Sequence, residues 1–167
     1  MKKQLFSIFL AFLFIFALVP SVFATNNTAL SNQNSADIIY LDNGSYIVTT
    51  VITENTSTLS LTSESSTAFT QAGDKVVTCY DKNNNLEWKY TLFAEFEIVK
   101  GVSSTCTSAT YTQTIYASGW SFSNGNATKS GNTAYGVGTF KHKFLLVTIE
   151  TANIDIHLSC DAYGNLS

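Results

Sequence analysis

The chain has 167 residues, with twelve acidic residues, nine lysines and no arginine, and its formal net charge is −3. Proteins that bind nucleic acids usually present a basic, arginine-bearing surface, so this composition argues against a nucleic-acid partner. Aromatic residues make up 13 % of the chain, which argues against a disordered protein, and the length fits one domain with a sizeable core.

Residues 1–24 have the features of a signal peptide. Two lysines precede an apolar run from Leu5 to Val19, and small residues stand at the first and third positions before Thr25. A permanent anchor helix is the alternative, but the run is at the short edge of the ~17–25 residues that a membrane span requires. We therefore expect a secreted chain with no transmembrane anchor after cleavage. Its formal charge is −5, because seven lysines then remain against twelve acidic residues.

Residues 25–36 are rich in Asn, Ser and Thr, which predicts a flexible leader before the fold. From residue 37 to 54, two β-branched apolar runs flank Asn43-Gly44, a sequence typical of a tight β-hairpin. We expect a single β-sandwich domain over residues 37–167.

The strongest strand prediction is the segment 86–99, LEWKYTLFAEFEIV. Apolar residues recur there at every second position: Leu86, Trp88, Tyr90, Leu92, Ala94, Phe96 and Ile98. This period of two predicts a strand with one face on a core and the other in water, whereas a helix would scatter the same residues over several faces. The same parity argument places Trp88, and Trp120 further along the chain, in the core.

The rest of the chain predicts more strands separated by short turns. They are a loose edge strand and linker over 55–73, strands over 75–80, 105–117, 119–123, 127–129, 134–143 and 154–160, and a bulge at 124–126. The apolar run over 144–149 is either a buried crossing segment or the start of a strand. Short strands, hairpin turns and no convincing helix are typical of an antiparallel sandwich or barrel. We predict an all-β fold, an antiparallel β-sandwich of immunoglobulin-like architecture with about eight strands.

Three cysteines, Cys79, Cys106 and Cys160, lie in the exported part of the chain. Export permits disulfides, and an odd count leaves one thiol over, but the residues themselves leave all three pairings open. Their spacing matches no zinc site, because the sequence has neither C-x-x-C nor a nearby histidine cluster.

Five strings together resemble a family of small secreted all-β proteins of Gram-positive bacteria that has no assigned function. They are GSYIVTT (44–50), CYDKNNNLEW (79–88), SSTCTSA (103–109), KSGNTA (129–134) and SCDAYGNLS (159–167). These are turn and strand strings, so the resemblance implies a fold and says nothing about activity. It also implies a disulfide between Cys106 and Cys160, which match a recurrent cysteine pair of that family, and leaves Cys79 as a free thiol.

Metal sites find little support in the sequence. His142 and His157 are the only histidines, and a metal would need them together with Asp155 or Glu150. Asp155 and His157 share the polar parity of their strand, so two surface histidines are the better interpretation. The turn over 81–85 begins like a calcium loop but lacks the glycine and the glutamate that such a loop requires. We predict no metal and no cofactor.

Catalytic patterns are also weak. Carboxylates for a glycosidase pair would have to come from Glu87, Glu95, Glu97, Glu150 or Asp161. Neighbours two residues apart on a strand are ~7 Å apart, close to the ~5–5.5 Å of a retaining pair, but they lie on a face predicted to be solvated. There is no G-x-S-x-G motif, and nothing except the nearby Lys75 and Lys82 marks Cys79 as an activated thiol. We predict that the protein is not an enzyme.

We predict a secreted extracellular protein that acts as a binding or structural component at or near the cell envelope. A cell-wall glycan or another surface protein is the candidate partner. A carbohydrate-binding module would need a row of coplanar exposed tyrosines on one sheet face. A membrane-active or antagonistic protein would need an exposed apolar patch, for which residues 144–149 are the candidate.

Overall fold

The computed structural model describes residues 36–54 and 68–167. The predicted signal peptide, nearly all of the predicted leader and most of the predicted linker lie outside these residues. No helix in the described part of the chain is long and apolar enough to cross a membrane. The described elements are β1 (Ala36–Tyr40), β2 (Tyr46–Glu54), β3 (Ala68–Tyr80), β4 (Leu86–Val99), β5 (Ser103–Ile115), β6 (Trp120–Ser130), β7 (Thr133–Phe144) and β8 (Val147–Ser159).

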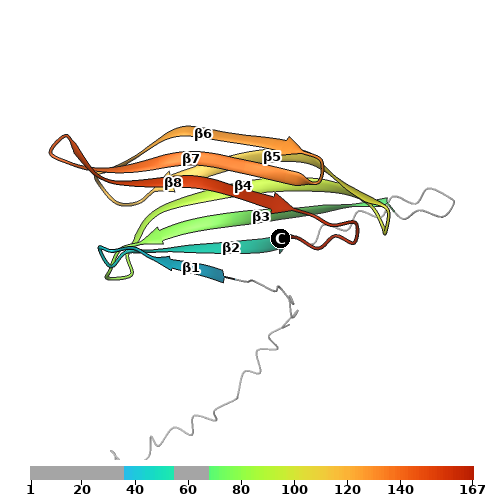
Figure 1. Cartoon of the computed structure of the whole chain (residues 1–167), viewed down its shortest axis with the longest axis horizontal. Coiled ribbons are helices and arrows are strands. Elements are labelled where there is room, and N and C mark those ends of the chain that lie inside the picture. The colour runs from blue at the N-terminus through green and yellow to red at the C-terminus, as the bar shows by residue number, and fades with distance from the viewer. Residues whose placement is uncertain (1–35, 55–67) are drawn as a thin grey trace, which may run out of the picture. The chain divides into compact units, whose positions relative to one another are not determined.

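The strands form two antiparallel sheets (Figure 1). The larger sheet has the order β1-β2-β3-β4-β5, and the smaller sheet has the order β6-β7-β8. The chain passes from one sheet to the other between β5 and β6. The predicted all-β, antiparallel β-sandwich is therefore confirmed, with eight strands in the described chain. The likeness to an immunoglobulin fold is limited to the two-layer architecture. Within each sheet the strands follow one another in chain order.

Strand β4 has the bounds that its period of two predicts, and it pairs with β3 on one side and β5 on the other. Its inner side chains Trp88, Tyr90, Leu92 and Phe96 have no exposed surface. Burial of one large apolar side chain contributes about 1.5–3 kcal/mol to the free energy of unfolding. The inner face of β4 is therefore the main layer of the core.

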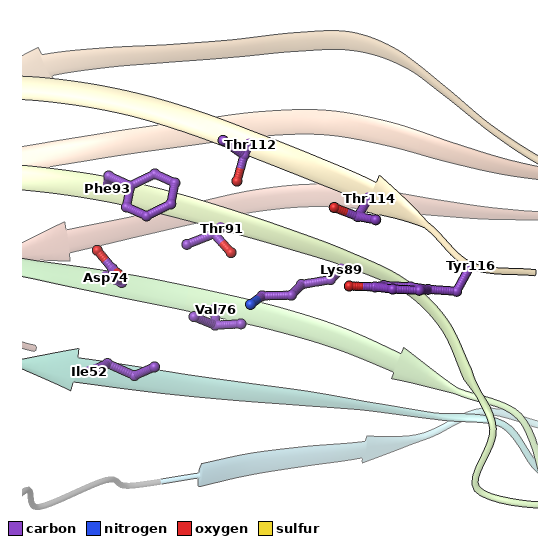
Figure 2. Close-up of a pocket in the computed structure, with 9 residues that line it drawn as sticks. All are labelled: Ile52, Asp74, Val76, Lys89, Thr91, Phe93, Thr112, Thr114 and Tyr116. Atoms are coloured by element: carbon purple, nitrogen blue, oxygen red, sulfur yellow. The ribbon is translucent and has the colours of Figure 1, made fainter.

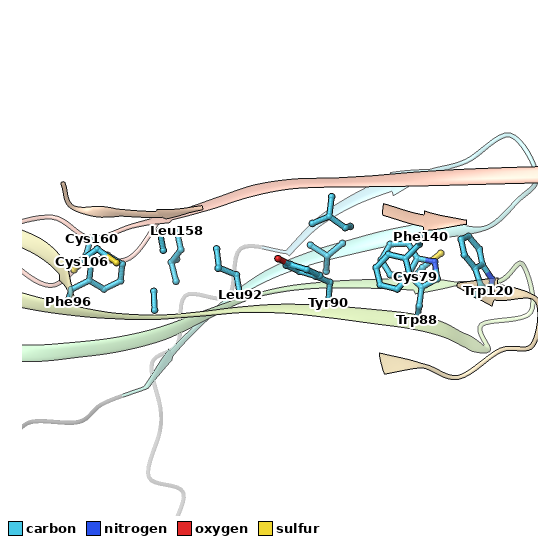
Figure 3. Packing of buried hydrophobic residues seen from close by; sticks show 14 of the residues in the cluster. Cys79, Trp88, Tyr90, Leu92, Phe96, Cys106, Trp120, Phe140, Leu158 and Cys160 are labelled. Carbon is cyan, nitrogen blue, oxygen red and sulfur yellow. The ribbon is translucent and has the colours of Figure 1, made fainter. Parts of the chain in front are cut away.

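Aromatic rings join the two sheets in this core (Figure 3). The Trp88 ring stacks on Phe140 of β7, with centroids 4.1 Å apart and an interplanar angle of 12°. Trp120 of β6 meets Trp88 edge-on at 5.9 Å and 65°. The predicted core positions of both tryptophans are confirmed, because Trp88 is 0 % and Trp120 7 % exposed.

Two glycines on the inner face of β7 make room for the rings. A Cβ at Gly138 would stand 2.5 Å from the ring of Phe122, and a Cβ at Gly136 would stand 2.8 Å from the hydroxyl of Tyr90. Cβ atoms do not tolerate contacts below 3.0 Å without a shift of the neighbour. Gly136 therefore lets Tyr90 of the larger sheet lie close to β7, and Gly138 leaves room for the ring of Phe122 on the neighbouring strand β6.

Strand β3 is longer than predicted. The sequence predicts a linker up to Gly73 and a short strand over 75–80, whereas the structure has one strand of 13 residues that begins at Ala68. Its first half lies opposite Ala94–Val99 of β4, so its polar residues gain ladder hydrogen bonds from a partner distant in sequence. The bulge predicted at 124–126 is confirmed by a register shift between Ser123 and Asn126.

We expect Gly138→Ala to lower the free energy of unfolding by about 1–3 kcal/mol, the usual cost of overpacking a tight core. Urea denaturation measures this change. Ser123→Ala introduces the same residue at an exposed position of β6 and should change the free energy by less than about 0.5 kcal/mol. Equal stability of Gly138→Ala and wild type would contradict the close approach of Gly138 to Phe122.

Candidate functional site at the β7–β8 hairpin tip

The turn between β7 and β8 presents an apolar tip, which we define as residues Phe144–Val147. The exposed fractions of Phe144, Leu145, Leu146 and Val147 are 65 %, 82 %, 98 % and 64 %. A register shift leaves Ile149 of β8 without a partner on β7, and this side chain is 60 % exposed beside them. The loop lies at one end of the smaller sheet, on the left in Figure 1. A buried crossing over 144–149 is therefore wrong, and the predicted strand start is confirmed from Val147 onward.

The backbone of the apolar tip is strained. Leu145 has φ 47° and Leu146 has φ 73°, both in the left-handed region. Two successive positive φ values are what a two-residue type I′ hairpin turn requires, and Asn-Gly is the usual sequence there. A residue with a Cβ loses roughly 1–2 kcal/mol in this conformation. Neither turn chemistry nor burial explains two leucines at these positions.

The base of the hairpin is held firmly, in contrast to its exposed end. The backbone N–H of Lys143 donates to the carbonyl oxygen of Gly119 at 2.9 Å. The His142 ring stacks on Trp120 at 4.9 Å and 13°. The Asn43 side-chain amide donates to Glu150 Oε2 at 3.2 Å, which ties the β1–β2 turn to β8. The core therefore fixes where the apolar tip points.

Basic side chains lie directly behind the apolar tip. Lys143 precedes Phe144 and is exposed, and Lys141 is half-buried on the same strand. The acidic residue opposite them, Glu150, is half-buried and accepts the hydrogen bond from Asn43. Lys143 is thus an exposed positive charge next to the apolar tip, although the chain as a whole is acidic.

Glu87 does not lie on the solvated face where the sequence pattern places it with Glu95 and Glu97. Tyr80 pairs with Leu86 and Cys79 pairs with Trp88. Glu87 therefore has no partner on β3 and forms a β-bulge. Its carboxylate turns inward and accepts a hydrogen bond from the Cys79 thiol at 3.6 Å. A strict period of two misses this bulge.

Cys79 is buried and unsuited to thiol chemistry. Burial, followed by the charge of Glu87 and the hydrogen bond to it, raises the pKa of the Cys79 thiol to about 12. Burial and then Glu87 also raise the pKa of the Glu150 carboxyl. A thiol that stays protonated at neutral pH is a poor nucleophile and a poor metal ligand. Cys79 is a free thiol in the structure, as are Cys106 and Cys160.

The predicted Cys106–Cys160 bond is not formed in the structure, where both residues are buried free thiols. The Cys106 thiol donates to the carbonyl oxygen of Ser108 at 3.2 Å, and the Cys160 thiol to that of Asp161 at 3.6 Å. The two cysteines nevertheless lie side by side at one end of the core (Figure 3). Their backbone N–H groups donate to the carbonyl oxygens of the consecutive turn residues 131 and 132.

The two histidines lie far apart. His142 is half-buried against Trp120, whereas His157 is exposed and pairs with Tyr135, seven residues along β7 from His142. At ~3.3 Å per residue this separation is about 23 Å. Among the residues that the structure describes, no three His, Cys, Asp or Glu side chains are placed to hold a metal ion.

The turn over 81–85 closes on itself. Asp81 Oδ1 accepts hydrogen bonds from the backbone N–H groups of Asn83 and Asn85, and Oδ2 accepts one from the Asn85 side chain. The hydrogen bonds from Asn85, then those from Asn83, lower the pKa of the Asp81 carboxyl. The residues that resemble a calcium loop thus form a hairpin turn.

The tyrosines on the outer face of the larger sheet do not form a flat platform. Tyr40, Tyr46 and Tyr80 lie side by side on β1, β2 and β3. The rings of Tyr46 and Tyr80 stack face to face at 5.1 Å and 16°, and Tyr40 is tilted by 42° from Tyr46. A sugar ring stacks on an open aromatic face, and here one face of Tyr46 and one face of Tyr80 cover each other.

A hollow of about 170 Å³ lies on the same outer face (Figure 2). It is lined by Ile52, Asp74, Val76, Lys89, Thr91, Phe93, Thr112, Thr114 and Tyr116. Burial and then the charge of Glu54 raise the pKa of the Asp74 carboxyl, while Lys89 lowers it. Asp74 is the only carboxylate in this lining, which contains no histidine or cysteine, so the hollow has no acid–base pair or activated nucleophile.

No family model, no curated protein and no solved structure matches the chain. The resemblance to small secreted proteins of Gram-positive bacteria therefore stays a prediction.

We expect the double variant Leu145→Asn/Leu146→Gly to raise the free energy of unfolding by about 1–3 kcal/mol. Glycine adopts a positive φ without the steric cost of a Cβ, asparagine tolerates it better than leucine, and the lost side chains are exposed. Urea denaturation of the variant and of wild type measures the difference. A lower stability of the variant would mean that the leucines contribute packing that their exposure does not reveal.

Proposed function

We propose that the protein is a secreted, non-enzymatic β-sandwich that acts as a binding component at the cell envelope of a Gram-positive bacterium. Secretion is inferred from the signal-peptide features of residues 1–24. Binding is inferred from a single observation, the strained and exposed apolar tip. Exposed apolar residues in a row are unfavourable for a soluble protein unless they meet a partner.

The groups that an enzyme would use support a non-enzymatic role. The Cys79 thiol has a pKa of about 12 and lies buried in the core. Glu87 accepts the hydrogen bond from this thiol, and Glu150 accepts one from Asn43. The hollow over the larger sheet contains one carboxylate. The apolar tip has no catalytic groups. Contacts within the protein do not explain why its apolar side chains are exposed.

A glycan-binding role has less support than contact through the apolar tip. Glycan recognition would rest on open tyrosine faces, and the rings of Tyr46 and Tyr80 stack on each other instead. Leu145 and Leu146, at 82 % and 98 % exposed, suit an apolar partner and not a sugar hydroxyl. We therefore place the binding surface at the apolar tip.

We expect the exported protein, collected from culture medium, to be retained on purified envelope of a Gram-positive cell. The Leu145→Asn/Leu146→Gly variant should lose most of this retention although its fold is at least as stable. Val102→Ser removes a 75 % exposed apolar residue from the β4–β5 turn and is the matched control. Immunoblotting of bound and unbound fractions measures retention. An absence of retention, or equal retention of the tip variant, would contradict the proposal.

We also propose that Cys106 and Cys160 form a disulfide during export, when an external disulfide oxidises the two thiols and is itself reduced to two thiols. Their adjacent positions in the core support this pairing. The bond would close a loop of about 55 residues and stabilise the fold by roughly 4 kcal/mol on the loop-entropy model.

For the exported protein, thiol labelling under denaturing conditions should find one free cysteine, and three after reduction. Cys79→Ala should leave none, and Cys106→Ser should leave two, because Cys160 then loses its partner. Mass spectrometry of the labelled protein counts the thiols. Three labelled cysteines in unreduced wild type would refute the bond, whereas two labelled cysteines in Cys79→Ala would point to a pairing that uses Cys79.

A further inference from the structure

We propose that the apolar tip inserts into the surface of a lipid bilayer that contains anionic headgroups. This inference rests on the proposed envelope-binding function and names its partner. It depends on the length of the apolar tip, the charges behind it and its shape.

The length of the apolar tip fits insertion into the interfacial region. The apolar tip begins after the pair Lys143–Thr148. Between these two residues the chain contains only the pair Phe144–Val147 and the two leucines of the turn. Two residues of strand beyond that pair extend roughly 7 Å. Amphipathic segments that lie in the bilayer surface bury their apolar face by ~5–10 Å. The side chains would thus reach the acyl boundary while Lys143 stays at the level of the headgroups.

The charges favour an anionic surface and a single orientation. Lys143 is exposed and Lys141 half-buried, directly behind the apolar tip. Glu150, the acidic residue opposite them, is half-buried and hydrogen-bonded to Asn43. An anionic bilayer attracts these two lysines, although the chain as a whole is acidic.

Part of the backbone of the apolar tip is already hydrogen-bonded. The β7–β8 ladder continues to the pair Phe144–Val147, with Ile149 left unpaired at the register shift, so groups that face the partner strand are paired close to the turn. The hairpin base is fixed by the contact of Lys143 with Gly119 and by the stack of His142 on Trp120. A preformed and fixed hairpin loses little conformational freedom when it enters the bilayer.

The shape of the apolar tip argues against a protein partner. A standard protein–protein interface uses about 20–30 residues on each side. The apolar tip and Ile149 together offer five exposed side chains on a projecting loop. A projecting loop of this size is suited to a soft, non-specific apolar phase.

Vesicle flotation with the exported protein tests the inference. One set of vesicles contains phosphatidylcholine alone, and the other contains phosphatidylcholine mixed with phosphatidylglycerol. Wild type should bind the phosphatidylglycerol vesicles more tightly. Leu145→Asn/Leu146→Gly should reduce this binding by a factor on the order of ten or more, from the loss of two apolar side chains, while Val102→Ser should not. Lys141→Gln/Lys143→Gln should reduce it by about fivefold per lysine, with Lys100→Gln of the β4–β5 turn as the unaffected control.

Two results would overturn the inference. One is no binding of wild type to phosphatidylglycerol vesicles; if the apolar tip is still needed for retention on whole envelope, the proposed function stands with a protein or glycan as partner. The other is equal vesicle binding by wild type and the Leu145→Asn/Leu146→Gly variant. If wild type binds neither the vesicles nor the envelope, the inference and the proposed function are both overturned.

Discussion

The stack of Trp88 on Phe140 is the contact on which the sandwich depends. Its centroid distance of 4.1 Å sets the local spacing of the two sheets. The indole N–H groups of Trp88 and Trp120 have no hydrogen-bond partner among the described residues, and each such group costs about 1–3 kcal/mol. The packing of large rings at this end of the core has to offset that cost. It can do so because the inner face of β4 presents one large side chain after another.

This arrangement leaves part of the larger sheet uncovered. The smaller sheet packs β7 and β8 over β3, β4 and β5, so the two first strands extend beyond it. All five residues of β1 are exposed, and the inner residues Ile47 and Val51 of β2 are only partly buried. The core is therefore concentrated in the strands on either side of β4, and its inner aromatic residues dominate stability.

The sequence predicts both ends of β4 to the residue because apolar side chains recur at every second position from Leu86 to Ile98. It does not show the bulge at Glu87 inside this strand, and it misses the first half of β3, whose pairing depends on a strand distant in sequence. It also cannot tell an exposed apolar run from a buried one, since both have the same composition. Leu145 and Leu146 are exposed because β7 extends past the end of the sandwich. No local sequence pattern encodes that position.

Stability and the proposed binding are separable in this fold because they use different ends of the same strand. On β7, Gly136, Gly138 and Phe140 face the core, and the chain then leaves the sandwich at Lys143. Past that point the residues are exposed, so substitutions there cost the core nothing. A strained Leu-Leu turn lowers stability without any packing in return. Its strain is therefore best explained by a contact that the isolated chain does not make.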